Sequence, residues 1–91
     1  MTAKRVAVRK SGVLSADLDG TTMILNLGNR SYYTMAGVGP RVWELVQEPR
    51  DVAGLVDCIA TEYNVEWERA EKDIRDFLAD LDRNGLIDCE Y

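Results

Sequence analysis

The chain has 91 residues, 46% of them hydrophobic and 30% charged, and its 16 acidic and 11 basic residues give a formal net charge of −5. This composition is typical of one globular domain with a single modest core. The acidic balance argues against a nucleic-acid partner, because phosphates are bound by basic surface. No apolar run reaches the roughly 20 residues that span a bilayer, and no apolar signal segment follows the basic N-terminus. We therefore expect one domain over residues 1–91, located in the cytoplasm and without membrane contact.

Two absences limit the chemistry that the chain can carry. The sequence has no histidine, and its two cysteines, Cys58 and Cys89, lie far apart. Zinc sites need clustered thiolates or imidazoles, and catalytic nucleophiles commonly rely on a histidine base. We therefore expect no metal, no cofactor and no catalytic activity, and we expect both cysteines to be half-buried reduced thiols.

The first third of the chain predicts extended structure. Residues 1–12 leave two alternatives open, because Val6–Val8 is a candidate short strand in a basic segment that is otherwise expected to be frayed and solubilising. Val13–Leu18 is typical of a strand, and the turn pair Asp19–Gly20 closes it. Met23–Leu27 is the next candidate strand.

A third strand is expected to return beside the run Met23–Leu27. Alternation along that run separates two faces, one with Met23, Leu25 and Leu27 and the other with Ile24 and Asn26. After the turn at Gly28–Asn29, the run Ser31–Met35 leads back antiparallel. The three runs together predict a three-stranded meander.

The next segment predicts two short helices. Proline is favourable at a first helical position, so a helix is expected at about Pro40–Gln47. Its inner face would hold Val42, Trp43 and Val46, with the tryptophan in the core. Asp51 is a good N-cap for a second helix, whose apolar stripe is Val52, Leu55, Val56, Ile59 and Tyr63.

The third predicted helix is the longest, at about Trp67–Asn84, and Gly85 suits its C-terminal cap. Val65 against Ala70 would form a hydrophobic staple at its start, and its apolar stripe is Ala70, Ile74, Phe77, Leu78 and Leu81. Leu86–Tyr91 is expected to be extended. The order of elements predicts an α+β fold that is winged helix-turn-helix-like, with a three-stranded antiparallel N-terminal sheet followed by three helices.

These positions resemble a known family when they are taken together in order and spacing. The segments that carry the resemblance are Leu25–Leu27, Tyr32–Met35, Gly39, Val42–Val46, Val52–Val56, Glu62–Val65, Asp73–Leu81 and Gly85–Ile87. They resemble the PqqD-like family, also called RiPP recognition elements, over about residues 13–88. Two departures from the family pattern stand out, namely Met35–Ala36 in place of Leu-Asn and Glu66–Trp67 in place of an acidic residue and proline. The second departure leaves Trp67 as an exposed aromatic side chain and a candidate partner contact.

The resemblance implies a function in peptide binding. Members of this family bind the N-terminal leader of a ribosomally made precursor peptide and deliver it to a leader peptidase or another modifying enzyme, and free-standing members of this length are common in lasso-peptide pathways. The leader adds a strand to the third strand of the meander and packs on the third helix. Carried over to this chain, the expected peptide-binding residues are Arg30, Ser31, Tyr32, Tyr33, Thr34, Met35, Arg69, Ala70, Asp73, Ile74, Asp76 and Phe77.

Side-chain pockets must supply the specificity, because strand addition itself uses backbone hydrogen bonds that do not depend on sequence. If Met35 is in the core, Tyr33 faces the same way and lies near the groove. A charged flank on the third helix would suit a lysine or arginine beside an apolar leader residue, with Asp73 the favoured contact; it comprises Glu66, Arg69, Asp73, Asp76 and Asp80. A solvated helix face and a gap-filling Tyr33 are the structural alternatives.

Two other functions are compatible with the predicted fold. A winged-helix DNA-binding regulator would need basic residues on its recognition helix, and the second predicted helix has none. A scaffold subunit of a processing enzyme would bind the enzyme without touching the peptide. The outer strand also leaves open whether the chain is a monomer or a weak strand-paired dimer.

Overall fold

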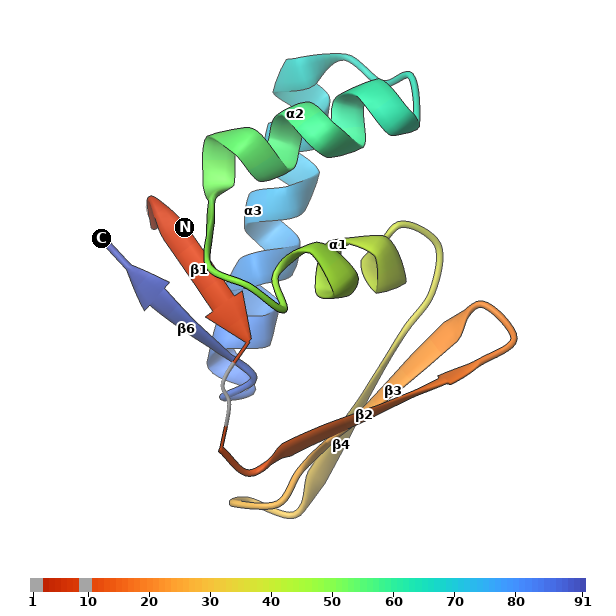
Figure 1. Ribbon diagram of the computed structural model, residues 1–91, viewed down its shortest axis with the longest axis vertical. Coiled ribbons are helices and arrows are strands. Elements are labelled where there is room, and N and C mark those ends of the chain that lie inside the picture. The colour runs from red at the N-terminus through yellow and green to blue at the C-terminus, as the bar shows by residue number, and fades with distance from the viewer. Residues whose placement is uncertain (1–2, 9–10) are drawn as a thin grey trace.

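The computed structural model of the chain describes residues 3–8 and 11–91 (Figure 1). Its elements in chain order are β1 (Arg5–Val8), β2 (Val13–Leu18), β3 (Thr21–Asn26), β4 (Ser31–Met35), α1 (Gly39–Leu45), β5 (Arg50–Asp51), α2 (Val52–Glu62), α3 (Trp67–Arg83) and β6 (Ile87–Glu90). The predicted fold class is confirmed, since a three-stranded antiparallel sheet is followed by three helices. Within the described ranges, no helix is long and apolar enough to cross a membrane.

The predicted meander is present as the sheet β2-β3-β4, with both strand pairs antiparallel. Leu14 pairs with Leu25, which pairs in turn with Tyr32 on β4. The turn between β2 and β3 uses Asp19 and Gly20 at positive φ, as expected for this dipeptide. The turn between β3 and β4 places Arg30 at a φ of 58°. Arg30, which was expected to bind the peptide as part of the strand, is therefore a turn residue that precedes β4.

The helices cover the less apolar of the two faces of β3. Thr22, Ile24 and Asn26 are buried, whereas Leu25 on the opposite face is exposed. Asn26 is accommodated because its side-chain amide donates to the Asn84 carbonyl oxygen at 2.9 Å and its side-chain oxygen accepts from the Gly28 N–H at 3.0 Å. Because both polar groups of the Asn26 side chain are hydrogen-bonded, this face of β3 can be buried although it carries a polar residue.

A second sheet, β5-β1-β6, brings together three segments that are distant in sequence. β1 is its middle strand and pairs antiparallel with both neighbours. Ala3 and Val6 are buried in the main core, and the Val8 N–H donates to the Val46 carbonyl oxygen. The expectation of a frayed N-terminus is therefore wrong for residues 3–8, while positions 1–2 and 9–10 lie outside the described residues. The extended C-terminal segment is confirmed and is β6.

The two short helices follow the predicted order with small differences. Asp51 occupies the N-cap position of α2, but its side chain makes no capping hydrogen bond. It lies 3.4 Å from the Arg5 guanidinium instead, so the capping role is corrected. Tyr63 is also a correction, because it lies past the end of α2 and is exposed rather than part of the buried stripe.

The C-terminus of α3 is closed as the Asn84–Gly85 pair predicts. Gly85 has a φ of 71°, the left-handed conformation that glycine adopts without a steric penalty. The N–H of Leu86 donates to the carbonyl oxygen of Leu81, and the N–H of Gly85 donates to that of Asp82, each at 3.0 Å. These two bonds are a Schellman cap, which turns the chain into β6 (Figure 1).

Candidate functional site between β4 and α3

Strand β4 presents an edge that could accept another strand. Its pairing partner is β3, and no other strand in the described residues pairs with it. Side chains alternate as predicted: Tyr33 and Met35 point inward, whereas Tyr32 and Thr34 are exposed. An unpaired strand edge offers N–H donors and C=O acceptors to an extended peptide.

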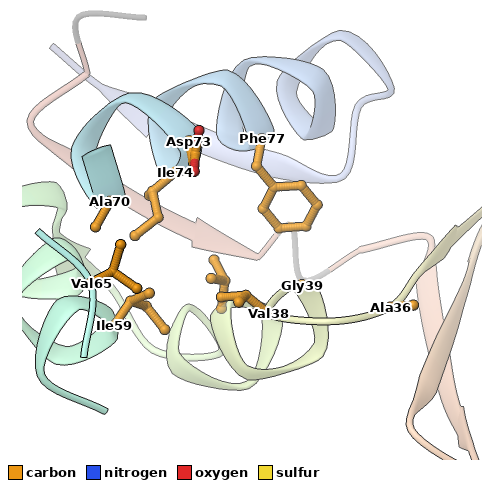
Figure 2. A pocket seen from close by; sticks show the side chains of 10 residues that line it. Ala36, Val38, Gly39, Ile59, Val65, Ala70, Asp73, Ile74 and Phe77 are labelled. Atoms are coloured by element: carbon orange, nitrogen blue, oxygen red, sulfur yellow. The ribbon is translucent and has the colours of Figure 1, made fainter. Parts of the chain in front are cut away.

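Past the end of β4 lies a pocket of about 290 Å³ between the three helices and the chain that leaves the strand (Figure 2). Figure 2 shows the Phe77 ring reaching from α3 toward Val38 and Gly39 at the start of α1, while Ile74 points toward Val65 and Ile59. The volume is near the lower limit for small-molecule sites and suits one or two apolar side chains. The lining residues are Ala36, Val38, Gly39, Val42, Ile59, Val65, Ala70, Asp73, Ile74 and Phe77.

Close packing at Gly39 joins the three elements around the pocket. A Cβ built on Gly39 would lie 2.9 Å from the Met35 Cβ and 3.4 Å from the Phe77 Cζ. The absence of a side chain at Gly39 therefore lets the end of β4, the start of α1 and the Phe77 ring come together. Met35 is buried in the core, as expected.

A hydrogen bond links β4 to the C-terminal half of α3. The Tyr33 hydroxyl donates to Asp80 Oδ2 at 2.7 Å, and Arg83 donates to Asp80 Oδ1 at 2.7 Å. Desolvation of the phenol and the adjacent carboxylate raise the pKa of Tyr33 to about 12. The hydrogen bonds from Tyr33 and Arg83 lower the pKa of Asp80. These contacts hold Tyr33 between sheet and helix and give Asp80 a structural partner.

The remaining charged candidates lie at the surface of α3. Asp73 lines the pocket and is its one ionisable residue, while Arg69 lies 4.0 Å from its carboxylate one turn away. Asp76 pairs with Lys72 at 3.1 Å and does not line the pocket. The predicted charged flank is therefore divided, with Asp73 and Arg69 near the pocket and Asp76 directed to a neighbouring lysine.

The structure thus gathers part of the predicted set. Ala70, Asp73, Ile74 and Phe77 share the pocket, and Ser31–Met35 forms the adjacent strand. Sequence reasoning missed the pocket residues outside β4 and α3, which are Ala36, Val38, Gly39, Val42, Ile59 and Val65. Their signal was indirect, since small and aliphatic residues of short helices are expected in any core.

Four other residues that the sequence singled out, two tryptophans and two cysteines, lie outside the pocket. The Trp67 indole is partly exposed and donates to Asp57 of α2, while Trp43 is buried as predicted. Cys58 and Cys89 are free and half-buried, and burial is the main cause that raises the pKa of the Cys89 thiol. In the described part of the chain, no group of three His, Cys, Asp or Glu residues could hold a metal ion.

Comparisons with known proteins bear on the fold and the family. The solved structure described as "TbiB1 in Complex with the TbiA(beta) Leader Peptide" is 33% identical and superposes with a TM-score of 0.82, covering 90% of this chain and 94% of that one. A second, "Lasso peptide synthetase B1 complexed with the leader peptide", is 21% identical with a TM-score of 0.79, over 90% and 95% of the two chains, and supports the fold. Among curated proteins, no sequence matches this chain. The PqqD family, described as coenzyme PQQ synthesis protein D, matches residues 21–87, and the chain belongs to that family.

Proposed function

We propose that this chain binds the leader region of a ribosomally synthesised precursor peptide and has no catalytic role of its own. The leader would add a strand to β4 and place apolar side chains in the pocket beside α3. The observation that carries the proposal is the unpaired β4 edge together with the apolar pocket that begins at Ala36, directly after the end of β4. The 33% identical protein that was solved with a leader peptide supports it.

The proposed contacts divide into two kinds. Backbone atoms of Ser31–Met35 would supply the hydrogen bonds of the added strand, and these do not depend on the leader's side chains. Ala70, Ile74 and Phe77 would receive an apolar anchor. The exposed Asp73 carboxylate would favour a leader with a lysine or arginine next to that anchor, and it would affect association rate and register more than affinity.

The peptide would then pass to a leader peptidase or another peptide-modifying enzyme. A lasso-peptide pathway is the candidate, since one structural relative is described as a lasso peptide synthetase. We propose a cytoplasmic location for this step. We further propose that the free chain is a monomer or a weak dimer paired through β4, in which a second copy occupies the leader's place.

Neither alternative function gains support from a specific contact. The winged-helix reading would use α2 as a recognition helix, and Val52–Glu62 contains no lysine or arginine. A scaffold that never touches the peptide would leave the β4 edge and its pocket without a role.

Titration of the protein with the leader encoded beside its gene tests the proposal directly. Strand addition predicts a complex of micromolar or tighter affinity, and backbone N-methylation of the leader should weaken it at alternate positions only, because alternate N–H groups face the partner strand. The N-methyl series leaves the protein unaltered, so misfolding cannot explain a loss. Equal tolerance at every position would contradict strand addition, and absence of a complex would contradict leader binding.

A further inference from the structure

The C-terminal end of α3 crosses the sheet β2-β3-β4, and two hydrogen bonds mark its path. Directly after the helix, the Asn84 carbonyl oxygen accepts from the side chain of Asn26 on β3. One helical turn earlier, Asp80 accepts from the hydroxyl of Tyr33 on β4. The helix therefore passes from the middle strand of the sheet to its edge strand, and the contact between Tyr33 and Asp80 lies where the helix crosses that edge strand.

The pocket beside α3 ends just before this crossing. Of the α3 residues that line the pocket, Phe77 is the one nearest to the C-terminus of the helix. Its ring approaches Gly39, which lies beyond the end of β4 (Figure 2). Neither Asp80, one turn farther along the helix, nor Tyr33 lines the pocket. The space between strand and helix is therefore open near Phe77 and closed at the contact between Tyr33 and Asp80.

The Tyr33 side chain is held at both of its ends. Its backbone belongs to β4, where it pairs with Ile24 of β3, and its hydroxyl donates to Asp80 Oδ2 at 2.7 Å. The other oxygen of that carboxylate accepts from Arg83, also at 2.7 Å, so the acceptor is fixed as well. Because the phenol ring reaches from the strand to the helix, a peptide side chain can enter this space only if the hydrogen bond breaks.

A leader strand added to β4 would bring every second side chain to the same side of the sheet as the Tyr33 ring. These inward side chains follow one another at about 6.6 Å along the strand. One of them can reach the pocket, which begins at Ala36, directly after β4. The inward side chain two residues away, toward the Ser31 end of β4, would lie beside Tyr33, because Tyr33 and Met35 are also two residues apart and share the inner face.

From these contacts we infer that Tyr33, held by Asp80, selects leaders by the size of one side chain. The accepted leader carries a large apolar residue for the pocket and a small residue two positions away, on the side that lies beside Tyr33. A large residue at that second position would have to displace a ring that is packed and hydrogen-bonded, which costs affinity by overpacking. The inference rests on the proposed leader binding and adds to it a residue that rejects unsuitable leaders.

Titration calorimetry with variants of the leader encoded beside the gene tests this size selection. Alanine scanning of the leader first identifies the apolar anchor as the position with the largest loss of affinity. Alanine and leucine are then compared at each of the two positions that lie two residues from the anchor, of which only one lies beside Tyr33. For the wild-type protein, we expect the alanine leader to bind about tenfold more tightly than the leucine leader at one of these positions, and a smaller difference at the other.

Three protein variants separate the ring from its hydrogen bond and from the strand. Tyr33→Val removes the ring and keeps a side chain that suits a strand, so leucine should bind at least as tightly as alanine at the selective position. Tyr33→Phe keeps the ring without its bond to Asp80 and should reduce the discrimination by about threefold or more. Tyr32→Val is the matched control, because Tyr32 is the next residue of β4 but lies on the exposed face. It should change the affinities for both leaders by the same factor.

A cooperative thermal melt shows which variants are folded, and Tyr33→Phe alone decides the matter if Tyr33→Val does not fold. Equal affinities for the alanine and leucine leaders at both positions of the wild-type complex would overturn the inference and leave leader binding itself intact. Discrimination that persists at full strength in the Tyr33 variants, or that Tyr32→Val removes, would also overturn it. Absence of any complex between the wild-type protein and its leader would instead refute the proposed function, and the inference with it.

Discussion

At the scale of single residues, the contact between Tyr33 and Asp80 combines the structural and functional roles that the sequence left open. The phenol fills the space between sheet and helix, and its hydroxyl also reaches a carboxylate on α3 at 2.7 Å. Arg83, one helical turn away, donates a second hydrogen bond to the same carboxylate. Residues that are 47 positions apart in sequence are thereby connected, which no local pattern predicts.

The contact between Tyr33 and Asp80 predicts how the stability of the protein depends on pH. The pKa of Asp80 is lowered in the folded state, so its contribution to stability is present above the ordinary carboxyl pKa and is lost as the pH falls below it. The pKa of Tyr33 is raised to about 12, so its contribution is present below about pH 10 and is lost as the pH rises toward 12. Urea unfolding should show Asp80→Asn destabilised at about pH 7 and the difference from wild type reduced at about pH 3.

A matched carboxylate on the same helix controls for the change of net charge in that experiment. Asp76 is exposed and pairs with Lys72 on the surface, and exposed pairs contribute about 0–1 kcal/mol. Asp76→Asn should therefore change the unfolding free energy little at either pH. A pH-independent effect of Asp80→Asn would show that its role is packing and not charge.

At the scale of elements, the site depends on how closely β4, α1 and α3 approach one another. Met35 ends the strand, Gly39 begins the helix, and Phe77 covers both from α3. The sequence indicated a break and a helix start near Gly39 and Pro40, but it did not indicate that a third element fills the space a side chain would need. Packing distance between elements is a property of the assembled fold.

Gly39→Ala tests this junction. The new Cβ would lie 2.9 Å from the Met35 Cβ, which is backbone-proximal and cannot move freely. We expect a cost of about 1–3 kcal/mol from overpacking and a weaker complex with the leader, measured by thermal unfolding and by titration. Gly54→Ala is the control, because apart from the neighbouring backbone of α2 no atom of the protein lies within 4 Å of a Cβ at that position. It should stabilise the helix by about 0.5–1 kcal/mol, and equal destabilisation by the two variants would contradict the steric account.

At the scale of the whole molecule, the N-terminal strand ties both ends of the chain to the core. β1 lies between β5 and β6, and Val6 is buried with the helices. The N–H of Val52 at the start of α2 donates to the Lys4 carbonyl oxygen at 2.7 Å. The segment expected to be a solubilising tail is therefore a central element of the second sheet.

Deletion of residues 1–8 should abolish cooperative folding, because it exposes the inner surface of β5 and β6 and leaves their ladder groups unpaired. Circular dichroism with thermal and urea melts would measure the loss, which is expected to approach the total stability of about 5–15 kcal/mol typical of small domains. Deletion of Tyr91, which is exposed and follows β6, should cost far less. A cooperative melt near the wild-type midpoint after deletion of residues 1–8 would contradict the central role of β1.

Local patterns in the sequence determined the order and type of the main elements. Alternation predicted the meander, the 3.6-residue stripe of Ile74, Leu78 and Leu81 predicted α3, and Asn84–Gly85 predicted its cap, because each signal is carried by neighbouring residues. The same order and spacing carried the family resemblance, and with it the strand and helix on which the proposed site lies.

Only the tertiary structure decided which face of β3 is buried, where the edge segments pair and which helices complete the pocket. The more apolar face, with Leu25, is outside because Asn26 on the other face finds partners at Asn84 and Gly28. β1 is a strand because β6, at the other end of the chain, supplies its ladder. Each of these outcomes depends on contacts between residues distant in the sequence, so the residues of a single segment contain no signal for it.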